Sequence, residues 1–500
     1  MASSEVAVLI DVLLEQAARA GDRPAVGDPF RELSFDNLVR FSDVMRRRIT
    51  DATDRPHVGL LLPSSCAFAG ALYGCLWAGR TAVPLNFLLQ PAEIAAVVED
   101  AGLDAVYTIR HFEELASALP VRALYMEDLP LKRDMVMQRV RRLPPPPNVR
   151  PDDTAVLLYT SGTSGDPKGV CQTYANLRAD VDGAIELAQL NSEHRFLGVL
   201  PLFHSFGLTA MLLVPVALGS SVFYLPRFNP SQVIETLRGR RISVTMMIAS
   251  MFTALLRTKS GSAADLATVQ YAVSGGEALP DAVHAAFKDR FGVDIIQGYG
   301  MTEASPVVSL NVPWANRVGT VGLPLPNIGV AAFDDDGNRL GPDEIGELRI
   351  RGPIVMKGYY NKPAETEAVI TPDRWYLTGD MGCVDADGYI RITGRKKEMI
   401  IVGGENVYPR EIESVLERHP AVAEAAVIGQ RDASRGEVVI AFVTLRESLT
   451  ATEIEIRDHC RAHIAGYKVP RRVVISAGLP RGPTGKILKK NLASLLESVL

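Results

Sequence analysis

The sequence predicts an α/β protein in which a large N-terminal domain precedes a small α+β domain. Three observations lead to this prediction. Strand-length apolar runs alternate with helical patterns as far as Gln297, which is typical of parallel sheets covered by helices. From about residue 320 the runs become short, alternating and bounded by turns, and from Glu398 onward helices and strands mix. The length of 500 residues also exceeds what one hydrophobic core supports.

These observations divide the chain into two domains. Residues 1–394 are expected to form two αβ subdomains rich in parallel strands, ending at about 320–394 in a small β-barrel lobe. Residues 395–500 are expected to form a mobile C-terminal α+β domain.

The N-terminal domain is expected to begin with a helix at Val6–Ala18, where apolar residues recur at helical spacing. A strand pair and a second helix follow, with Ser34 as N-cap of that helix. Strands then alternate with helices at His57–Pro63, Cys66–Gly79, Thr81–Leu85 and Pro91–Ala101.

Two polar segments precede the central part of the domain. Lys132 to Arg142 is basic and predicts a solvated helix, and the four prolines from Pro144 to Pro147 predict a stiff connector. A strand at Ala155–Tyr159 follows. Five further strands are expected at Arg195–Leu200, Ser221–Leu225, Ser243–Ile248, Thr268–Ser274 and Asp294–Gln297.

The last third of the chain has a different texture. The lobe is expected to contain strands at Val330–Asp334, Gly346–Gly352 and Tyr389–Thr393. The C-terminal domain is expected to contain elements at Ile400–Val402, Pro409–Arg418, Val422–Ile428, Val438–Leu445, Ala451–His463 and Arg472–Ile475.

Composition limits the class of protein. A net charge of −5 and a pI near 6 argue against a nucleic-acid partner. The five cysteines have no metal-site spacing, which favours free thiols in a reducing compartment. The start of the sequence lacks the pattern of a secretory signal, so a cytoplasmic enzyme is expected. The apolar run from Leu208 to Leu225 is interrupted by Pro215 and Gly219 and predicts buried core; a peripheral membrane contact stays open.

The most informative stretch is Leu158-Tyr-Thr-Ser-Gly-Thr-Ser-Gly-Asp-Pro-Lys-Gly169, which follows a predicted buried strand. Seven consecutive residues, Thr160 to Asp166, are Thr, Ser, Gly or Asp, and Lys168 adds a positive charge. Glycine permits close backbone approach, and hydroxyl and N–H groups can cradle an anion. The spacing differs from a Walker loop, so a phosphate-binding loop of another kind is predicted; the alternative is a flexible surface turn.

Four other stretches carry candidate chemistry. Gln297-Gly-Tyr-Gly-Met-Thr-Glu303 places an aromatic ring between two glycines and then offers oxygen ligands suited to Mg²⁺. Trp375-Tyr-Leu-Thr-Gly-Asp380 puts a carboxylate on a predicted tight turn, where it could bind two ribose hydroxyls. Gly394 to Pro409 joins the two domains and is a candidate hinge. Pro480-Arg-Gly-Pro-Thr-Gly-Lys486 places a lysine on a glycine-containing loop.

Together and in this order, the five stretches resemble the adenylate-forming superfamily, which includes acyl-CoA synthetases, luciferase-like enzymes and peptide-synthetase adenylation domains. The resemblance covers nearly the whole chain and implies ATP, Mg²⁺ and coenzyme A, or a phosphopantetheine thiol, as cofactors. It implies catalytic or metal-binding roles for Thr302, Glu303 and Lys486, with Glu303 on the metal. It implies that ATP and the thiol arm contact Thr160, Ser161, Gly162, Thr163, Ser164, Gly165, Lys168, Gly276, Glu277, Ala278, Gly298, Tyr299, Gly300, Asp380, Arg395, Gly403 and Gly404.

The same resemblance implies two half-reactions: a carboxylate attacks ATP to form an acyl adenylate, and a thiol then displaces AMP. The C-terminal domain would rotate about Lys397 between them, withdrawing Lys486 and bringing in the Gly403–Tyr408 loop.

The acid and the acceptor are less specified. Pro201-Leu-Phe-His-Ser-Phe-Gly-Leu208 resembles the segment lining the acyl site, where His204 is a gate, a carboxylate neighbour or a packed histidine. The expected pocket segments, Phe206–Leu213, Met246–Phe252 and Ser305–Leu310, are apolar, which predicts a hydrophobic acid such as a medium- to long-chain fatty acid. The nearest likeness is to bacterial acyl-carrier-protein synthetases and long-chain fatty acyl-CoA synthetases. An aryl-acid or amino-acid ligase, a non-catalytic homologue, either thiol, and a monomer or homodimer stay open.

Overall fold

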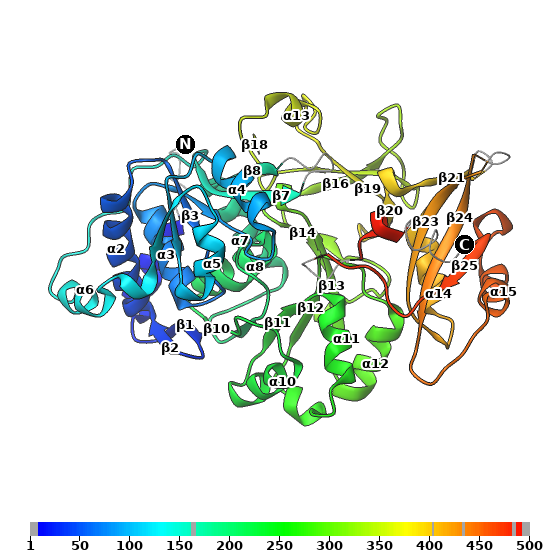
Figure 1. Ribbon diagram of the computed structural model, residues 1–500, viewed down its shortest axis with the longest axis horizontal. Coiled ribbons are helices and arrows are strands. Elements are labelled where there is room, and N and C mark those ends of the chain that lie inside the picture. The colour runs from blue at the N-terminus through cyan, green and yellow to red at the C-terminus, as the bar shows by residue number, and fades with distance from the viewer. Residues whose placement is uncertain (1–8, 162–166, 403–404, 433–435, 483–486, 493–500) are drawn as a thin grey trace.

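A computed structural model describes residues 9–161, 167–402, 405–432, 436–482 and 487–492. The chain forms an elongated molecule, with the N-terminal domain at one end and the C-terminal domain at the other (Figure 1). Within the described ranges, no helix is long and apolar enough to cross a membrane. The five cysteines are free, as predicted, and all of them are buried.

Two large sheets form the N-terminal domain. The first has the order β18 (Gly358–Tyr359), β8 (Pro167–Thr173), β7 (Thr154–Ser161), β4 (Thr81–Pro84), β3 (His57–Leu60), β5 (Ala105–Thr108) and β6 (Arg122–Tyr125). Its strands from β7 to β6 pair in parallel, and β8 and β18 are antiparallel.

The second sheet is larger. Its order is β15 (Leu323–Pro324), β14 (Val307–Leu310), β13 (Ile295–Gly300), β12 (Tyr271–Ser274), β11 (Val244–Met247), β9 (Arg195–Gly198), β10 (Ser221–Tyr224), β1 (Pro24–Asp28) and β2 (Arg31–Ser34). The strands from β13 to β1 are parallel, and β2, β14 and β15 are antiparallel additions at the two edges. The two parallel-rich subdomains are therefore confirmed.

One hydrophobic core joins the two sheets, since it takes residues from strands of both. Helices α1 (Leu9–Ala20), α2 (Phe35–Ala52), α3 (Cys66–Trp77), α7 (Tyr174–Leu187) and α9 (Val214–Leu218) contribute to it. All residues of α3 except Ala67 are buried, as expected for a helix that is apolar on every face. Ser34 caps α2 by accepting a hydrogen bond from Asn37 N, as predicted.

The remaining helices cover the outer faces or link strands. They are α4 (Pro91–Asp100), α5 (Glu113–Ser117), α6 (Leu131–Gln138), α8 (Ser205–Leu208), α10 (Pro230–Gly239), α11 (Ala249–Arg257), α12 (Asp281–Phe291) and α13 (Pro363–Glu367). A π-helical turn at Thr209–Leu213 joins α8 to α9, and its residues are all buried. The apolar run from Leu208 to Leu225 is mostly buried and belongs to the core, as predicted.

The lobe is an antiparallel sheet of β16 (Gly329–Phe333), β17 (Gly346–Arg351), β19 (Tyr376–Val384) and β20 (Ile390–Arg395). The predicted small β lobe is therefore present as an open sheet and not as a barrel, since β16 and β20 are edges among the described strands. Asp380 lies inside β19 and not on the predicted tight turn: the strand is continuous, and Gly379, with φ of +68°, lies where its register with β17 shifts.

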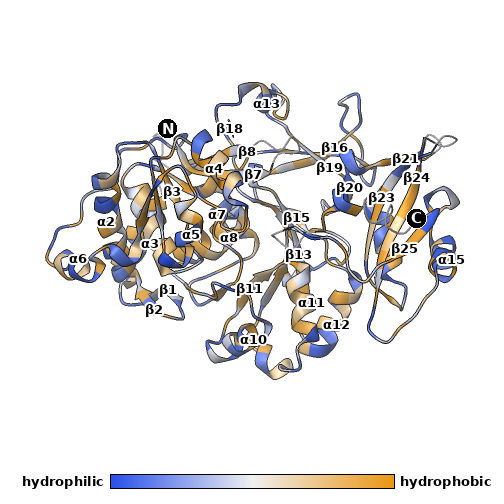
Figure 2. Ribbon diagram, viewed as in Figure 1, coloured by the Kyte–Doolittle hydropathy of each residue, from blue (hydrophilic) through white to orange (hydrophobic). Residues whose placement is uncertain are grey.

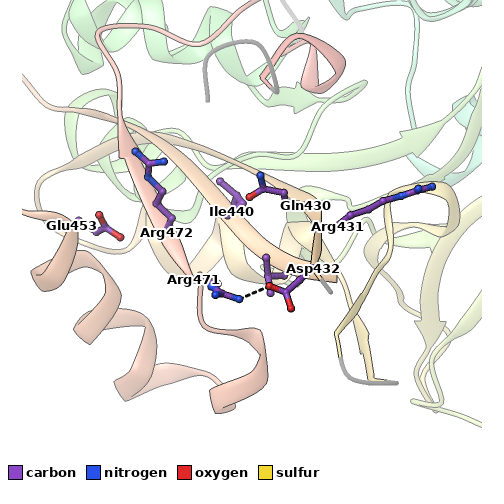
Figure 3. Close-up of a pocket in the computed structure, with 8 residues that line it drawn as sticks. Gln430, Arg431, Asp432, Ile440, Glu453, Arg471 and Arg472 are labelled. Atoms are coloured by element: carbon purple, nitrogen blue, oxygen red, sulfur yellow. Dashed lines mark hydrogen bonds and ion pairs between the residues drawn. The ribbon is translucent and has the colours of Figure 1, made fainter. Parts of the chain in front are cut away.

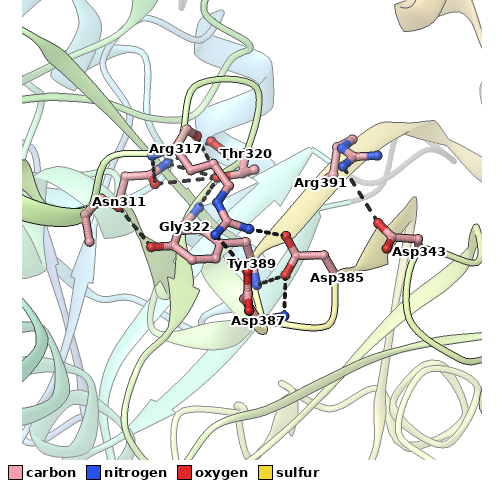
Figure 4. A network of polar contacts seen from close by, with 10 residues as sticks. Asn311, Arg317, Thr320, Gly322, Asp343, Asp385, Asp387, Tyr389 and Arg391 are labelled. Carbon is pink, nitrogen blue, oxygen red and sulfur yellow. Dashed lines mark hydrogen bonds and ion pairs between the residues drawn. The ribbon is translucent and has the colours of Figure 1, made fainter.

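A polar network fastens the lobe to the second sheet (Figure 4). The Arg317 guanidinium contacts Asp385 at 2.6 Å and Asp387 at 2.9 Å, and it lies 3.9 Å from the centre of the Tyr389 ring. Asn311, which follows β14, accepts from Arg317 N at 3.1 Å and donates to Thr320 O at 2.8 Å. The lobe is thus positioned against the strands that carry the central site.

The C-terminal domain has its own sheet and core (Figure 2). Strands β22 (Glu405–Val407), β21 (Ile400–Val402), β24 (Gly436–Leu445) and β23 (Val422–Asp432) are antiparallel, and β25 (Arg472–Ile475) pairs in parallel with β24. Helices α14 (Pro409–Glu417) and α15 (Glu453–His463) pack on this sheet. The predicted α+β character is confirmed, while the division at 394/395 and its mobility stay predictions.

Candidate active site

The carboxyl ends of four parallel strands of the second sheet provide the base of the site. Ile248 follows β11, the Gly275–Ala278 loop follows β12, and Met301 to Ser305 follow β13. The segment containing His204 follows β9. In α/β folds ligands bind beyond the carboxyl ends of strands, so one edge of the sheet gathers residues that are far apart in the sequence.

The described part of the predicted phosphate loop lies at the end of β7 and the start of β8, which pair with each other. Thr160 pairs with Lys168, and Ser161 pairs with Pro167, across the two strands. Gly162, Thr163, Ser164 and Gly165 lie outside the described residues. Lys168 is half-buried, and its Nζ lies 5.2 Å from the centre of the Tyr359 ring.

Tyr359 connects this hairpin to Glu303. It lies in β18, next to β8, and its hydroxyl donates to Glu303 Oε1 at 2.9 Å. Burial, reinforced by the Glu303 carboxylate, raises the pKa of Tyr359, so the phenol keeps the proton that it donates. Tyr376 of β19 lies beside Tyr359, and burial raises its pKa in the same way.

Backbone contacts fix the short helical turn of Thr302 and Glu303. Gln172 Nε2, on β8, donates to Thr302 O at 2.8 Å, and Met356 N donates to Glu303 O at 2.8 Å. The turn is therefore anchored to the first sheet although it follows a strand of the second. A carboxylate, a hydroxyl and a lysine from both sheets are brought to one place.

Asp380, Arg395 and Tyr299 form a second group. Asp380 and Arg395 lie opposite each other on β19 and β20, and Arg395 Nε is 2.7 Å from Asp380 Oδ1. The Tyr299 hydroxyl donates to Asp380 Oδ2 at 2.5 Å. Burial raises the pKa of the Asp380 carboxyl, and the Arg395 guanidinium opposes that rise. The residues predicted around ribose are thus in direct contact.

The glycines predicted around adenine have steric reasons to be glycines. Gly276 has φ of +80° and is exposed. A Cβ at Gly300 would lie 2.1 Å from Pro306 O. Gly298 lies within β13, opposite Leu310. Ala278 is exposed, whereas the Glu277 carboxylate accepts from Ser250 N at 2.7 Å, in the first turn of α11.

The segment predicted to line the acyl site brings aromatic and apolar groups to the same edge. His204 is exposed at the start of α8, with its ring centre 4.9 Å from that of Phe203. The following Ser205 Oγ lies 3.3 Å from Thr302 Oγ1. Phe206 packs so closely over Gly275 that a Cβ there would lie 2.9 Å from its ring.

The structure describes the predicted hinge residue but only part of the C-terminal loops. Lys397 is exposed in a 3-10 turn, Lys396–Glu398, that joins β20 to β21. Gly403, Gly404 and Lys486 lie outside the described residues. Lys489, just beyond that lysine, is mostly buried and contacts Glu398 at 2.9 Å and Glu413 at 2.8 Å.

Four contributing residues escaped the sequence reasoning: Gln172, Ser205, Tyr359 and Tyr376. Ser205 follows the candidate His204 directly, so its position could have been noticed. Tyr376 lies within the stretch Trp375–Asp380, of which only Asp380 was singled out, whereas Gln172 and Tyr359 lie in strands outside the five stretches. Their contacts arise only when the two sheets and the lobe assemble.

A separate hollow in the C-terminal domain shares no lining residue with the groups just described (Figure 3). It has a volume of about 510 Å³ and is lined in part by Arg431, Arg471 and Arg472. Arg471 is paired with Asp432 at 2.5 Å. The hollow thus offers cationic side chains but none of the predicted adenylate contacts.

Comparison with known families places the chain. Residues 13–360 match the AMP-binding enzyme family, and residues 411–486 match the AMP-binding enzyme C-terminal domain. A long-chain-fatty-acid–CoA ligase of Bacillus subtilis (strain 168) is 32% identical over 529 residues, covering 97% of this chain and 94% of the relative. A sulfoacetate–CoA ligase of Cupriavidus necator is 36% identical over 503 residues, covering 97% of both chains.

Solved structures agree. ATP-bound MatB from Rhodopseudomonas palustris has a TM-score of 0.90 at 26% identity, covering 98% of this chain and 99% of that chain. The o-succinylbenzoate CoA synthetase of Bacillus subtilis, in complex with ATP and magnesium ion, has a TM-score of 0.83 at 29% identity, covering 96% and 99%. The protein is an ATP-dependent, AMP-forming acid–CoA ligase, and its chain belongs to the AMP-binding enzyme family.

Proposed function

We propose that this ligase activates a hydrophobic carboxylic acid, in particular a medium- to long-chain fatty acid, and transfers it to coenzyme A. The observation that carries the proposal is the apolar character of the sheet edge beside Thr302. Phe206, Ile248 and Met251 are partly buried there and pack against the main core. Apolar walls with few polar groups are typical of sites for hydrophobic ligands.

The contacts of the Glu277 carboxylate favour a substrate acid with an uncharged tail over an amino acid. Glu277 is committed to the N-terminal turn of α11 through Ser250 N. A site for an amino acid needs an acidic group near the substrate amine, and Phe203 to Gly207 contribute none. The relatives at similar identity act on a fatty acid in one case and sulfoacetate in another, so the choice of acid rests on these side chains.

In the first half-reaction a substrate carboxylate oxygen attacks the α-phosphorus of ATP, and pyrophosphate leaves. We assign Lys168 and the hairpin turn to the β- and γ-phosphates, and Asp380 with Arg395 to the ribose hydroxyls. Tyr299 and the glycines at 276, 298 and 300 would border the adenine. Lys486 would neutralise charge on the pentavalent phosphorus, so that positioning and electrostatics supply most of the rate.

Magnesium would be held by Glu303 together with phosphate oxygens, near Thr302. The donor set fits, since Glu303 accepts from Tyr359 through Oε1 alone, and Oε2 has no hydrogen-bond partner among the residues that the structure describes. No group of three His, Cys, Asp or Glu side chains within that part of the chain could hold a metal by itself. The ion, when bound, would neutralise phosphate charge.

In the second half-reaction the thiol sulfur attacks the acyl carbonyl, AMP leaves with the bonding electron pair, and the thiol proton is lost. We propose that residues 395–500 rotate about Lys397 between the two steps. One ion pair, Arg418 with Asp281 at 3.9 Å, joins the two domains beyond the hinge in the described part of the chain, and both side chains are exposed. Such a pair contributes little stability, which suits rotation.

The arginines of the C-terminal hollow favour coenzyme A over a carrier protein as the acceptor, because guanidinium groups bind phosphate. Replacing Arg431 and Arg472 by Ala is expected to raise the KM for coenzyme A and to leave pyrophosphate release unchanged. The exposed Arg227, changed to Ala, is the control. An unchanged KM for coenzyme A with a raised KM for carrier protein would reverse this assignment.

Pyrophosphate release tests the acid class directly. The full chain is given ATP, Mg²⁺ and straight-chain acids of rising length, with aryl and amino acids as comparisons. We expect turnover to rise with chain length and no turnover with amino acids; absence of turnover with hexanoate and every longer acid refutes the proposal. Ile248→Trp is expected to shorten the longest accepted acid, whereas the exposed Ile454→Trp leaves it unchanged.

A further inference from the structure

Helix α6 presents an outer face that no part of the described chain covers. Its inner face is held firmly: Asp134 forms an ion pair with Arg48, Gln138 O accepts from Arg40 Nη1 at 3.2 Å, and Leu131 and Met135 pack against the main core. The following proline connector is fastened as well, because Trp77 Nε1 donates to Pro145 O at 3.2 Å. The outer face is therefore rigidly displayed.

The centre of that face is apolar. Val136, Met137 and Val140 are 63%, 47% and 83% exposed. Val136 and Met137 lie in α6, and Val140 lies in the turn that follows the helix, where its N–H donates to Met137 O at 3.4 Å. Large apolar side chains gathered at such exposure are unusual in a surface helix whose opposite face already contacts the core.

Cations surround these apolar groups. Lys132, Arg133, Arg139, Arg141 and Arg142 are all exposed. The single carboxylate between residues 131 and 142 is Asp134, which is engaged with Arg48. No carboxylate of the described chain forms an ion pair with Lys132, Arg139, Arg141 or Arg142. The patch is strongly positive on a chain whose net charge is −5.

We infer that this outer face, residues 132–142, docks on the surface of an anionic phospholipid bilayer. Aliphatic side chains ringed by lysine and arginine match the boundary between acyl chains and negatively charged head groups. The apolar groups would enter the boundary while the cations contact phosphates.

The position of the patch favours a bilayer over an acidic carrier protein. A carrier protein that delivers a thiol must dock near the C-terminal loop that receives it, but α6 lies at the end of the molecule farthest from the C-terminal domain (Figure 1). A nucleic acid is disfavoured because the exposed groups are aliphatic, whereas bases stack on aromatic rings. A bilayer demands no such proximity or stacking.

The test is sedimentation of the full chain with vesicles of phosphatidylcholine, with and without phosphatidylglycerol. We expect binding to the anionic vesicles, weakened by added salt, and much weaker binding to neutral ones. Changing Lys132, Arg139 and Arg142 together to Glu is expected to lower vesicle affinity about 100-fold. Val136→Ser with Val140→Ser is expected to lower it about tenfold.

The matched control reverses three exposed cations elsewhere, Arg227, Arg257 and Lys259, to Glu and is expected to keep full vesicle affinity. Circular dichroism confirms that each variant is folded. The inference is overturned if the variant with reversed charges at α6 binds anionic vesicles as well as the control does, or if the wild type binds neutral vesicles equally well. It is also overturned if the reversed charges abolish binding to acidic carrier protein or nucleic acid while binding to vesicles is kept.

Discussion

The Tyr359 hydroxyl donates a hydrogen bond to Glu303 Oε1 at 2.9 Å, and the centre of the same ring lies 5.2 Å from Lys168 Nζ. One side chain thus touches both the proposed magnesium ligand and the proposed phosphate lysine. Because Tyr359 belongs to β18, the first sheet controls a carboxylate that follows a strand of the second sheet.

Tyr359→Phe keeps the ring beside Lys168 and removes the bond to Glu303. A hydrogen bond to a charged group contributes about 1.5–3 kcal/mol, so pyrophosphate release should slow by about 10- to 100-fold. Its Mg²⁺ dependence should shift to higher concentration, while the melting temperature changes little. Tyr360→Phe is the neighbouring control, and an equal effect from both variants would contradict the positioning role.

Lys486→Ala separates the half-reactions. Loss of a preorganised charge at the transition state should lower adenylate formation by about 100- to 1,000-fold. Formation of thioester from supplied acyl adenylate should be spared, since the proposed rotation withdraws this lysine. Single-turnover assays of each half measure this directly, and an equal loss in both halves would count against the rotation.

Lys397→Pro should give the opposite pattern. Proline restricts the backbone at the proposed pivot, so adenylate formation continues while thioester formation falls. The adjacent Lys396 contacts Asp335 at 2.9 Å and is a poor site for proline, so Lys397→Ala serves as the control for loss of the side chain alone. A proline variant with both halves intact would place the pivot elsewhere.

The stability of the C-terminal domain should depend on Glu417. Burial raises the pKa of this carboxyl from 4.5 to about 7, despite Arg410 at 3.6 Å. The folded state therefore holds a proton that the unfolded state releases, and stability contributed by that proton is lost as pH rises from about 4.5 to about 7.

Glu417→Gln removes this dependence. Relative to that of the wild type, the free energy of unfolding of the variant should rise by up to about 3 kcal/mol between pH 5 and pH 8. Calorimetric melting temperatures of both proteins at the two pH values give the comparison, and the exposed Glu447→Gln is the control. If the Glu417→Gln variant tracks the wild type at both pH values, Glu417 titrates normally.

The sequence by itself determined the local elements and the order of the chemical stretches. Ser34 caps its helix through the next turn, and α3 is buried because its residues are apolar or small on every face. The loop between Thr160 and Lys168 was recognisable for the same reason, since its glycines and hydroxyls are contiguous. Such features depend on neighbours only a few residues apart.

Only the tertiary structure decided which distant side chains meet. Tyr359 reaches Glu303 because β18 joins the first sheet, and Asp380 faces Arg395 because β19 and β20 pair in one register. The open lobe and the strand position of Asp380 departed from expectation because both depend on pairing between strands. A single sequence specifies such pairings through the packing of the whole chain, which periodicity within one segment does not reveal.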